Sequence, residues 1–182
     1  VVAKATAHAD VQIRDLFERF LPEDKRVKRL GTAIKPESIL ALKGNANTGE
    51  QLFAKAGGVQ CRNCHRIKKT GKELGPDLTK IGKKYNRAQL LETILQPSKV
   101  IDPKFLTYIV ETKQGRVHTG LLAKRTAEEV ILKDATNKQI RIAADNVEVL
   151  VPQRKSLMPE LLLRDMTAQE VADLLDYLDS LK

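Results

Sequence analysis

The chain has 182 residues, of which 42% are hydrophobic and 30% charged, and a formal net charge of +9. The composition is typical of a soluble globular protein. The length fits one domain, or a small domain with an insertion, and excludes two large domains. No window approaches the ~20 continuous apolar residues of a membrane span. Because the chain has only three Tyr, four Phe and no groove-reading motif, its charge indicates an acidic protein partner rather than nucleic acid.

The first segment is predicted to be helical. Apolar residues at helical spacing indicate an amphipathic helix over residues 10–21, with Asp10 as its N-cap and Pro22 just beyond it. The basic run at 25–29 is interpreted as a solvated connector from an upstream domain. Neither an initiator Met nor the apolar core of a secretion signal is in view, so we expect a piece of a longer protein. We assign residues 1–43 to this helical segment and linker.

A second helix is predicted directly before the cysteines. It is capped by Asn45 or Asn47 and ended by the glycine pair 57–58. Gly49 and Phe53 lie four residues apart and therefore share one face of this helix. A glycine, which has no side chain, beside an aromatic ring would let another helix cross closely at this face.

Cys61 and Cys64 are the only cysteines of the chain, and His65 follows them directly. At this spacing both thiols can form thioethers with the vinyl groups of a haem while the imidazole reaches the iron from the same side. We therefore expect one haem c, attached covalently through Cys61 and Cys64. A CxxC pair also occurs in redox disulfides and zinc sites, which stay as alternatives.

The residues Gly-Pro-Asp-Leu at 75–78 follow a basic loop. The carbonyl of Pro76 can accept a hydrogen bond from Nδ1–H of His65, which would fix the ring and its tautomer. The alternative is that Gly75 and Pro76 simply make a turn.

A third helix is predicted after this loop. Asn86 and Gln89 form the side-chain pair of a capping box, and Pro97 ends the helix. We assign residues 44–103 to the first part of the haem-binding core.

After the third helix, the spacing of the apolar residues changes from the helical period to an alternation of every second residue. Five short strands are predicted, at 106–110, 117–121, 130–132, 140–142 and 147–151. They suggest a small antiparallel barrel or curled sheet, inserted as residues 104–151. In this pattern Val117, Thr119 and Leu121 share the inner face, so His118 is expected to face solvent. We expect the insertion to shield the haem edge or to dock a neighbouring domain.

The sixth position of the iron has few candidate ligands. Met158 lies in an irregular stretch before Pro159, where a side chain can be aimed without regard to helical or strand periodicity. Met166, His118, His8 and an open site are the alternatives. We favour Met158.

The chain ends in a predicted helix. Thr167 and Glu170 form a capping box, and apolar residues recur at i, i+3, i+4 and i+7 from Val171. We assign residues 152–182 to the second part of the core. The fold class is then α+β, mainly helical, with a small barrel-like β insertion between the haem-attachment motif and the methionine.

The order of these motifs resembles a class I cytochrome c. The fuller pattern consists of GPDLTKIGKKY, ILQPSKVIDP, a strand-rich insert, SLMPELL and MTAQEVADLLDYL. It resembles the C-terminal haem-binding domain family of planctomycete and verrucomicrobial type, over residues 10–182.

This resemblance implies roles for particular residues. His65 and Met158 would be the axial ligands, Cys61 and Cys64 the haem anchors, and Pro76 the residue that orients His65. We also place Leu78, from the same motif as Pro76, among the haem-binding residues.

The resemblance also implies that Gly49 and Phe53 meet the last helix near Tyr177. It implies further that the module ends a longer secreted protein, for which a sugar- or alcohol-type dehydrogenase is a candidate upstream part. The insertion puts His65 and Met158 unusually far apart in sequence.

Two axial ligands leave no vacancy for a substrate, so we expect an electron-transfer domain and not an enzyme. Because haem attachment requires secretion, we expect a periplasmic or otherwise extracytoplasmic location. A basic surface near the haem would steer an acidic redox partner. Its members are Arg62, Arg66, Lys68, Lys69, Lys72, Lys80, Lys83, Lys84 and Arg87. The alternatives are a haem enzyme or gas sensor with an open sixth site, and a zinc or redox module without haem.

Overall fold

The structure is a computed structural model that describes residues 1–8, 11–54 and 61–182. Its α-helices are α1 (Val2–Thr6), α2 (Val11–Glu18), α3 (Pro36–Leu40), α4 (Ala46–Ala54), α5 (Ile81–Lys84), α6 (Arg87–Leu95) and α7 (Ala168–Ser180). Short 3₁₀ helices are η1 (Glu23–Lys25), η2 (Cys61–Asn63), η3 (Pro103–Phe105) and η4 (Ala144–Asn146). The strands are β1 (Arg66–Ile67), β2 (Thr70–Gly71), β3 (Thr107–Thr112), β4 (Val117–Arg125), β5 (Glu129–Lys133), β6 (Gln139–Ala143) and β7 (Val147–Gln153).

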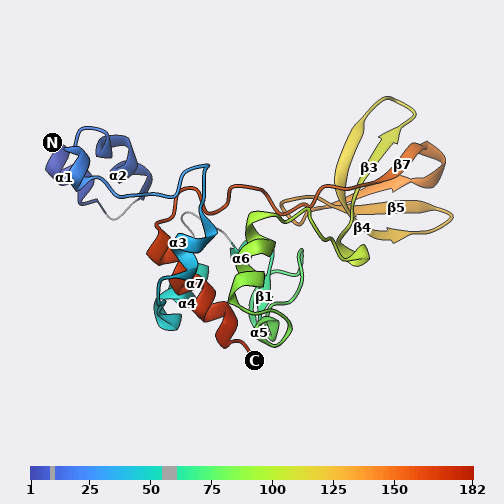
Figure 1. Cartoon of the computed structure of the whole chain (residues 1–182). Helices are drawn as coiled ribbons and strands as arrows, with labels where there is room; N and C mark the ends of the chain where they lie inside the picture. The colour runs from blue at the N-terminus through green and yellow to red at the C-terminus, as the bar shows by residue number, and fades with distance from the viewer. Residues whose placement is uncertain (9–10, 55–60) are drawn as a thin grey trace.

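Helix α7 is the centre of the helical part, where α3, α4, α5 and α6 pack against it (Figure 1). Both predicted capping boxes are present, Asn86 with Gln89 at α6 and Thr167 with Glu170 at α7. One hydrophobic core joins residues from both sides of the β insertion, among them Ile39, Leu91 and Leu175. Segments far apart in the sequence therefore form one helical unit.

Helices α4 and α7 make the close contact that was expected at Gly49. A Cβ at this position would lie 2.1 Å from the backbone oxygen of Asp173, so only glycine fits without displacing α7. The rings of Phe53 and Tyr177 are tilted against each other with centroids 6.1 Å apart. The start of α4 is capped by Asn45, whose side chain accepts from two backbone N–H groups. The glycine pair expected to end this helix lies outside the described residues.

Two carboxylates of α7 also hold the start of α4. The backbone N–H of Gly44 donates to Asp176 at 2.9 Å, and that of Asn45 donates to Asp173 at 2.9 Å. Asp173 is 7% exposed and also accepts from the Gln169 side chain at 2.9 Å. These bonds satisfy a carboxylate that would otherwise be costly to bury.

The five strands of the insertion form one antiparallel sheet in the order β6-β5-β4-β3-β7, with β6 and β7 at its edges. In the described residues no pairing joins these two edges, so the barrel-like closure is not confirmed. Figure 1 shows the sheet set to one side of the helices. It has its own small core, which includes Val110, Val130, Leu132 and Ile142.

The inner face of β4 differs from the prediction, and β7 does not keep the alternation that Val147, Val149 and Val151 suggest in the sequence. His118 pairs with Val110, which is fully buried, so His118 is half-buried on the core side and not directed at solvent. Val117, which shares the opposite face with Thr119, is 60% exposed. In β7 it is Leu150 that pairs with Val110, and Val151 is 41% exposed.

The physical reason for these errors is that alternation alone leaves two phases open. In β4 both Leu121 and Leu122 are apolar, so either phase places a leucine inside. In β7 a register shift beside Glu111 breaks the period of two, so Val147 and Leu150 both contact the same core.

The N-terminal segment differs from the prediction in its helix boundaries. It contains α1 in addition to α2, and α2 ends at Glu18, before Pro22. The N-cap proposed for residue 10 lies outside the described residues. The segment projects away from the other helices (Figure 1), and the linker is tied back by Leu30 N–H, which donates to the Met166 carbonyl at 2.9 Å. None of the helices in the described ranges has both the length and the apolar character needed to cross a membrane.

Candidate haem site

The site is built on one tight turn. Backbone N–H groups of Cys64 and His65 both donate to the carbonyl of Cys61, at 3.1 and 2.9 Å. This turn begins with η2 and brings both sulfur-bearing residues and the imidazole together. Covalent attachment of one haem requires this proximity.

The loop after the turn folds back onto it. Leu74 and Gly75 N–H groups donate to the Cys64 carbonyl at 3.0 and 2.7 Å, and Leu78 N–H donates to the Arg66 carbonyl at 2.8 Å. The Arg66 guanidinium also holds the loop, because it pairs with the Asp77 carboxylate at 2.9 Å. These contacts bring the Gly-Pro-Asp-Leu motif against the histidine.

Asp77 is part of this loop's own scaffold. Hydrogen bonds from Thr79, with one from Arg66, lower the pKa of Asp77 to about 2. Its carboxylate accepts from the Thr79 backbone N–H at 2.7 Å. Asp77 is therefore ionised at neutral pH and committed to holding the loop.

The His65 ring is held by Pro76, with Nδ1 lying 2.9 Å from the Pro76 carbonyl oxygen. A carbonyl can only accept, so the proton lies on Nδ1 and Nε2 keeps its lone pair. Burial lowers the pKa of His65, and the bond to Pro76 partly opposes this shift. The ring is therefore neutral at pH 7, the form in which imidazole binds a metal.

Gly75 provides the space that the His65 ring occupies. A Cβ at residue 75 would lie 2.6 Å from Cε1 and 2.9 Å from Nδ1 of the ring, which is closer than atoms can pack. The sequence pattern marked Gly75 only as part of a turn. Its signal was its position directly before the proline whose carbonyl holds the histidine.

We expect Gly75→Ala to displace the His65 ring and weaken its bond to Pro76. Overpacking of this kind costs about 1–3 kcal/mol. The haem should stay attached, because Cys61 and Cys64 are unchanged, but the optical spectrum should change and the free energy of unfolding should fall. Gly115→Ala, at an open turn with φ of +74°, is the control: it should cost about 1 kcal/mol and leave the spectrum unchanged. Identical spectra for both variants would contradict the role of Gly75.

The two cysteines are free thiols in this structure and are half-buried. Burial raises the pKa of Cys61 to about 11 and also raises the pKa of Cys64. A catalytic redox pair needs the opposite, a thiol whose pKa is lowered. A zinc site would require at least three His, Cys, Asp or Glu side chains grouped around the ion. The described part of the chain contains no such group. The donor set therefore fits haem attachment better than either alternative.

The candidates for the sixth iron ligand lie in different environments. Met166 is 7% exposed and belongs to the core of the helical part, where it acts as a packed thioether. His118 lies in the sheet, and His8 lies in the exposed N-terminal segment. Met158 is half-buried in an irregular stretch and belongs to neither hydrophobic core. Leu78 packs, partly buried, against the helical core, and its contact with haem stays a prediction.

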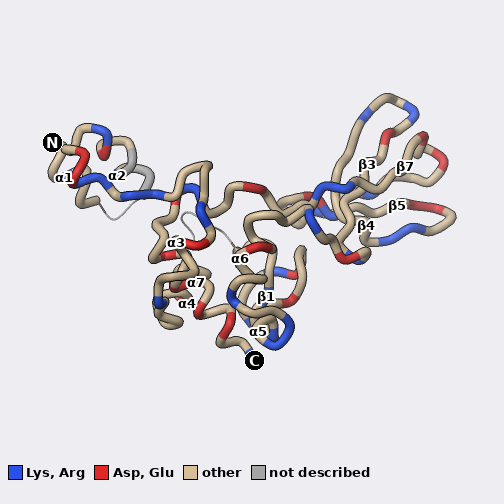
Figure 2. The backbone as a smooth tube through the Cα atoms, viewed as in Figure 1, with Lys and Arg blue, Asp and Glu red and all other residues tan. Residues whose placement is uncertain are grey.

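Two of the basic residues expected on the docking surface have internal partners instead. Arg66 pairs with Glu73 and Asp77. Arg87 pairs with Asp176 at 2.8 Å and donates to the carbonyls of residues 40 and 42, so it joins α6 to its neighbours. Six lysines among the other predicted members are exposed and lie in or directly beside β1, β2 and α5; they are Lys68, Lys69, Lys72, Lys80, Lys83 and Lys84. Figure 2 shows Lys and Arg positions along the backbone near α5.

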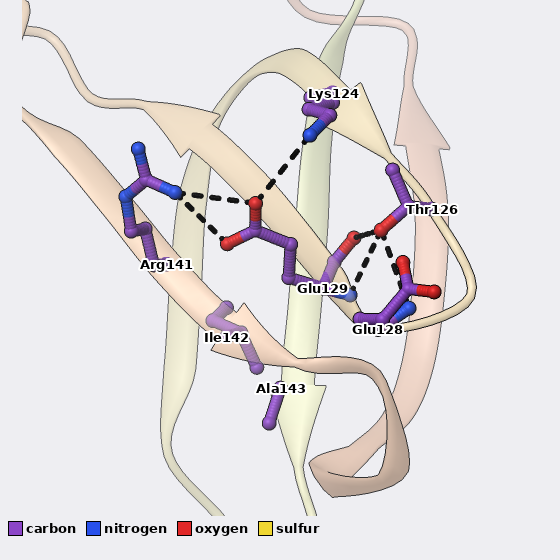
Figure 3. Close-up of a pocket in the computed structure, with 7 residues that line it drawn as sticks. All are labelled: Lys124, Thr126, Glu128, Glu129, Arg141, Ile142 and Ala143. Atoms are coloured by element: carbon purple, nitrogen blue, oxygen red, sulfur yellow. Dashed lines mark hydrogen bonds and ion pairs between the residues drawn. The ribbon is translucent and has the colours of Figure 1, made fainter.

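A hollow of about 520 Å³ lies on the β sheet and is lined by residues of β4, β5 and β6 and of the turn between β4 and β5 (Figure 3). The carboxylate of Glu129 at its edge is ion-paired with Arg141 at 3.0 Å and with Lys124 at 3.6 Å. Thr126 is engaged with the backbone of residues 128 and 129. The carboxylate of Glu129 and the hydroxyl of Thr126 are therefore already partnered.

A turn that carries two thiols and a neutral, oriented imidazole has the donor groups that covalent haem attachment requires. Residues 46–135 match the family model of cytochrome c, so this part of the chain is similar to the cytochrome c family. Its cofactor is haem c, attached covalently through the two cysteines, Cys61 and Cys64. The match includes His65 and Pro76 but ends before Met158. No curated protein matches the chain.

Proposed function

We propose that this cytochrome c domain carries a single haem with His65 and Met158 as axial ligands and passes single electrons between redox partners. The observation that carries the proposal is the 2.9 Å contact between His65 Nδ1 and the Pro76 carbonyl, beside two cysteines on the same turn. Residues 44–103 and 152–182 form the haem-binding part of the proposed domain, and residues 104–151 are its insertion.

The chain's own residues each perform a separate task. Cys61 and Cys64 would anchor the haem, Pro76 holds the His65 ring that would bind its iron, and Met158 would supply the second iron ligand. When bound, haem c supplies an iron that takes up and releases one electron. With both axial positions filled by side chains, no position is left for a substrate, so the domain is an electron carrier and not an enzyme. A thioether ligand favours Fe(II) more than a second imidazole would, so the reduction potential is comparatively high.

The proposed partner is a redox protein with an acidic docking surface. The six exposed lysines near β1, β2 and α5 support this assignment. In the described part of the chain none of them is ion-paired with a carboxylate, as Arg66 and Arg87 are, although Lys84 lies over the Tyr85 ring at 4.9 Å. Such a surface accelerates encounter and permits fast release. Cytochrome c domains are typically extracytoplasmic, and we place this one in the periplasm, as the C-terminal module of a larger secreted protein of the planctomycete and verrucomicrobial type. An upstream dehydrogenase is a candidate electron donor, and the β insertion a candidate docking module for it.

We expect Met158→Leu to remove the far-red charge-transfer absorption of a thioether bound to Fe(III), while covalent haem is retained. The physical reason is that leucine has nearly the volume of methionine but no sulfur to donate. Oxidised and reduced optical spectra of the haem-loaded chain check this. Met166→Leu is the matched control, since it makes the same chemical change at a methionine that is buried in the core.

The opposite pattern would overturn the assignment. If Met166→Leu removed the absorption and Met158→Leu kept it, the ligand would be Met166. If the wild-type spectrum lacked the feature and carbon monoxide bound readily, the sixth position would be open, and a haem enzyme or gas sensor would be the better interpretation.

A further inference from the structure

The two connections between the helices and the sheet leave the sheet at the same end. Strands β3 and β7 are antiparallel neighbours, and Thr107, the first residue of β3, pairs with Gln153, the last of β7. One connection comes from α6 and the other leads to α7 (Figure 1). Met158 lies on the second connection, so the pairing of β3 with β7 limits where that stretch can begin.

One serine hydroxyl joins these two connections, and a second acts within the connection that carries Met158. The backbone N–H of Ser156 donates to Oγ of Ser98 at 3.1 Å, and the backbone N–H of Met158 donates to Oγ of Ser156 at 3.1 Å. Both bonds are partly buried. Ser98 follows Pro97, which is buried at the end of α6. The backbone of Met158 is therefore tied, through two hydroxyls, to the end of a packed helix.

This tie matters because the stretch around Met158 has no strand or helix of its own. Between β7 and α7, residues 154–167 contain no regular element longer than turns and one isolated bridge. Ordering such a stretch costs conformational entropy, and side-chain hydrogen bonds to its backbone offset part of that cost. Without them, the stretch would sample conformations in which the thioether is away from the iron.

We propose that Ser98 and Ser156 are positioning residues for the axial methionine. They act through the backbone of Met158 and shift the equilibrium between bound and dissociated thioether toward the bound form. This inference rests on the proposed function, specifically on Met158 as the sixth ligand. It also gives the β insertion a role within the site, because the sheet holds together the two connections that the serines join.

The test is the rate at which cyanide binds to the oxidised, haem-loaded chain, since cyanide must wait for the thioether to dissociate. Ser98→Ala removes the acceptor of the Ser156 N–H, and Ser156→Ala removes the acceptor of the Met158 N–H. Each should raise the cyanide-binding rate roughly fivefold, the factor that corresponds to the ~1 kcal/mol of one net hydrogen bond. Ser98→Thr keeps a hydroxyl and should restore the wild-type rate.

Two controls separate positioning from a general loss of stability. Ser38→Ala removes a hydroxyl that donates within the α3 region, to the Lys35 carbonyl at 2.8 Å, and should leave the rate unchanged. In a Met158→Leu background the site is already open, so adding Ser98→Ala should have no further effect on the rate. An equal effect of Ser98→Ala in both backgrounds would show that the serine does not act through Met158.

The outcomes also distinguish this inference from the function on which it rests. If Met158→Leu itself leaves cyanide binding at the wild-type rate, the proposed ligand is wrong. If Met158→Leu accelerates binding but both serine-to-alanine variants do not, the ligand stands and the positioning role is wrong.

Discussion

Replacement of both Cys61 and Cys64 by alanine is expected to abolish covalent haem attachment completely. A thioether needs a cysteine sulfur, and the chain has no other cysteine. The intact mass of the denatured wild-type chain should include haem, whereas that of the double variant should equal the bare polypeptide. Production must take place in an extracytoplasmic compartment with haem-attachment machinery, so that the wild type is loaded.

The control for this prediction is Met158→Leu, which acts at the iron and not at the anchor. It should keep the full haem mass although its spectrum changes. A double cysteine variant that still carried haem through denaturation would contradict attachment at these residues. A wild-type chain without haem mass, produced under the same conditions as a loaded reference cytochrome, would contradict it equally.

Gly49→Ala is expected to lower the free energy of unfolding by about 2 kcal/mol. The new Cβ would lie 2.1 Å from the Asp173 backbone oxygen and 2.8 Å from Cβ of Tyr177, so α4 and α7 must move apart. Overpacking against backbone costs about 3 kcal/mol, while the better helix propensity of alanine returns about 1 kcal/mol. The steric cost exceeds the gain in helix propensity because the backbone of α7, unlike the end of a flexible side chain, cannot move aside locally. Denaturant unfolding of the haem-loaded chain measures this change.

Gln51→Ala is the matched control on the same helix, two residues away and exposed. It should alter the free energy of unfolding by no more than about 0.5 kcal/mol. If Gly49→Ala were as stable as the wild type, the close crossing of α4 and α7 would be wrong. If both variants lost the same amount, the loss would not come from that crossing.

Much of the helical part could be predicted because its signals are local. The capping boxes at Asn86 and Thr167 each satisfy backbone N–H groups within one turn, so four residues suffice to mark a helix start. The contact of Gly49 with α7 could also be expected, because a glycine on a helix face lets the backbone of another helix approach closely. The partners of Asp173 and Asp176 could not be predicted, because they lie more than a hundred residues away at the start of α4.

The sheet was predictable in its number of strands but not in its faces or its edges. Alternation places residues on two sides without saying which side is covered, and it was the pairing with Val110 that put His118 inside. Which strands lie at the edges of the sheet depends on which strands pair. The pattern of apolar residues therefore could not predict the open order β6-β5-β4-β3-β7.

The attachment chemistry follows from five neighbouring residues, because the covalent spacing of the Cys61 and Cys64 thiols and the His65 imidazole already brings them together. The surroundings of this motif depend on the folded chain. Folding placed the Pro76 carbonyl on His65, paired Arg66 and Arg87 internally, buried Met166 in the core and left Met158 on a stretch tied to Ser98. The physical reason is that burial and hydrogen-bond partners depend on chain segments distant in sequence, whereas the spacing of three neighbouring side chains does not.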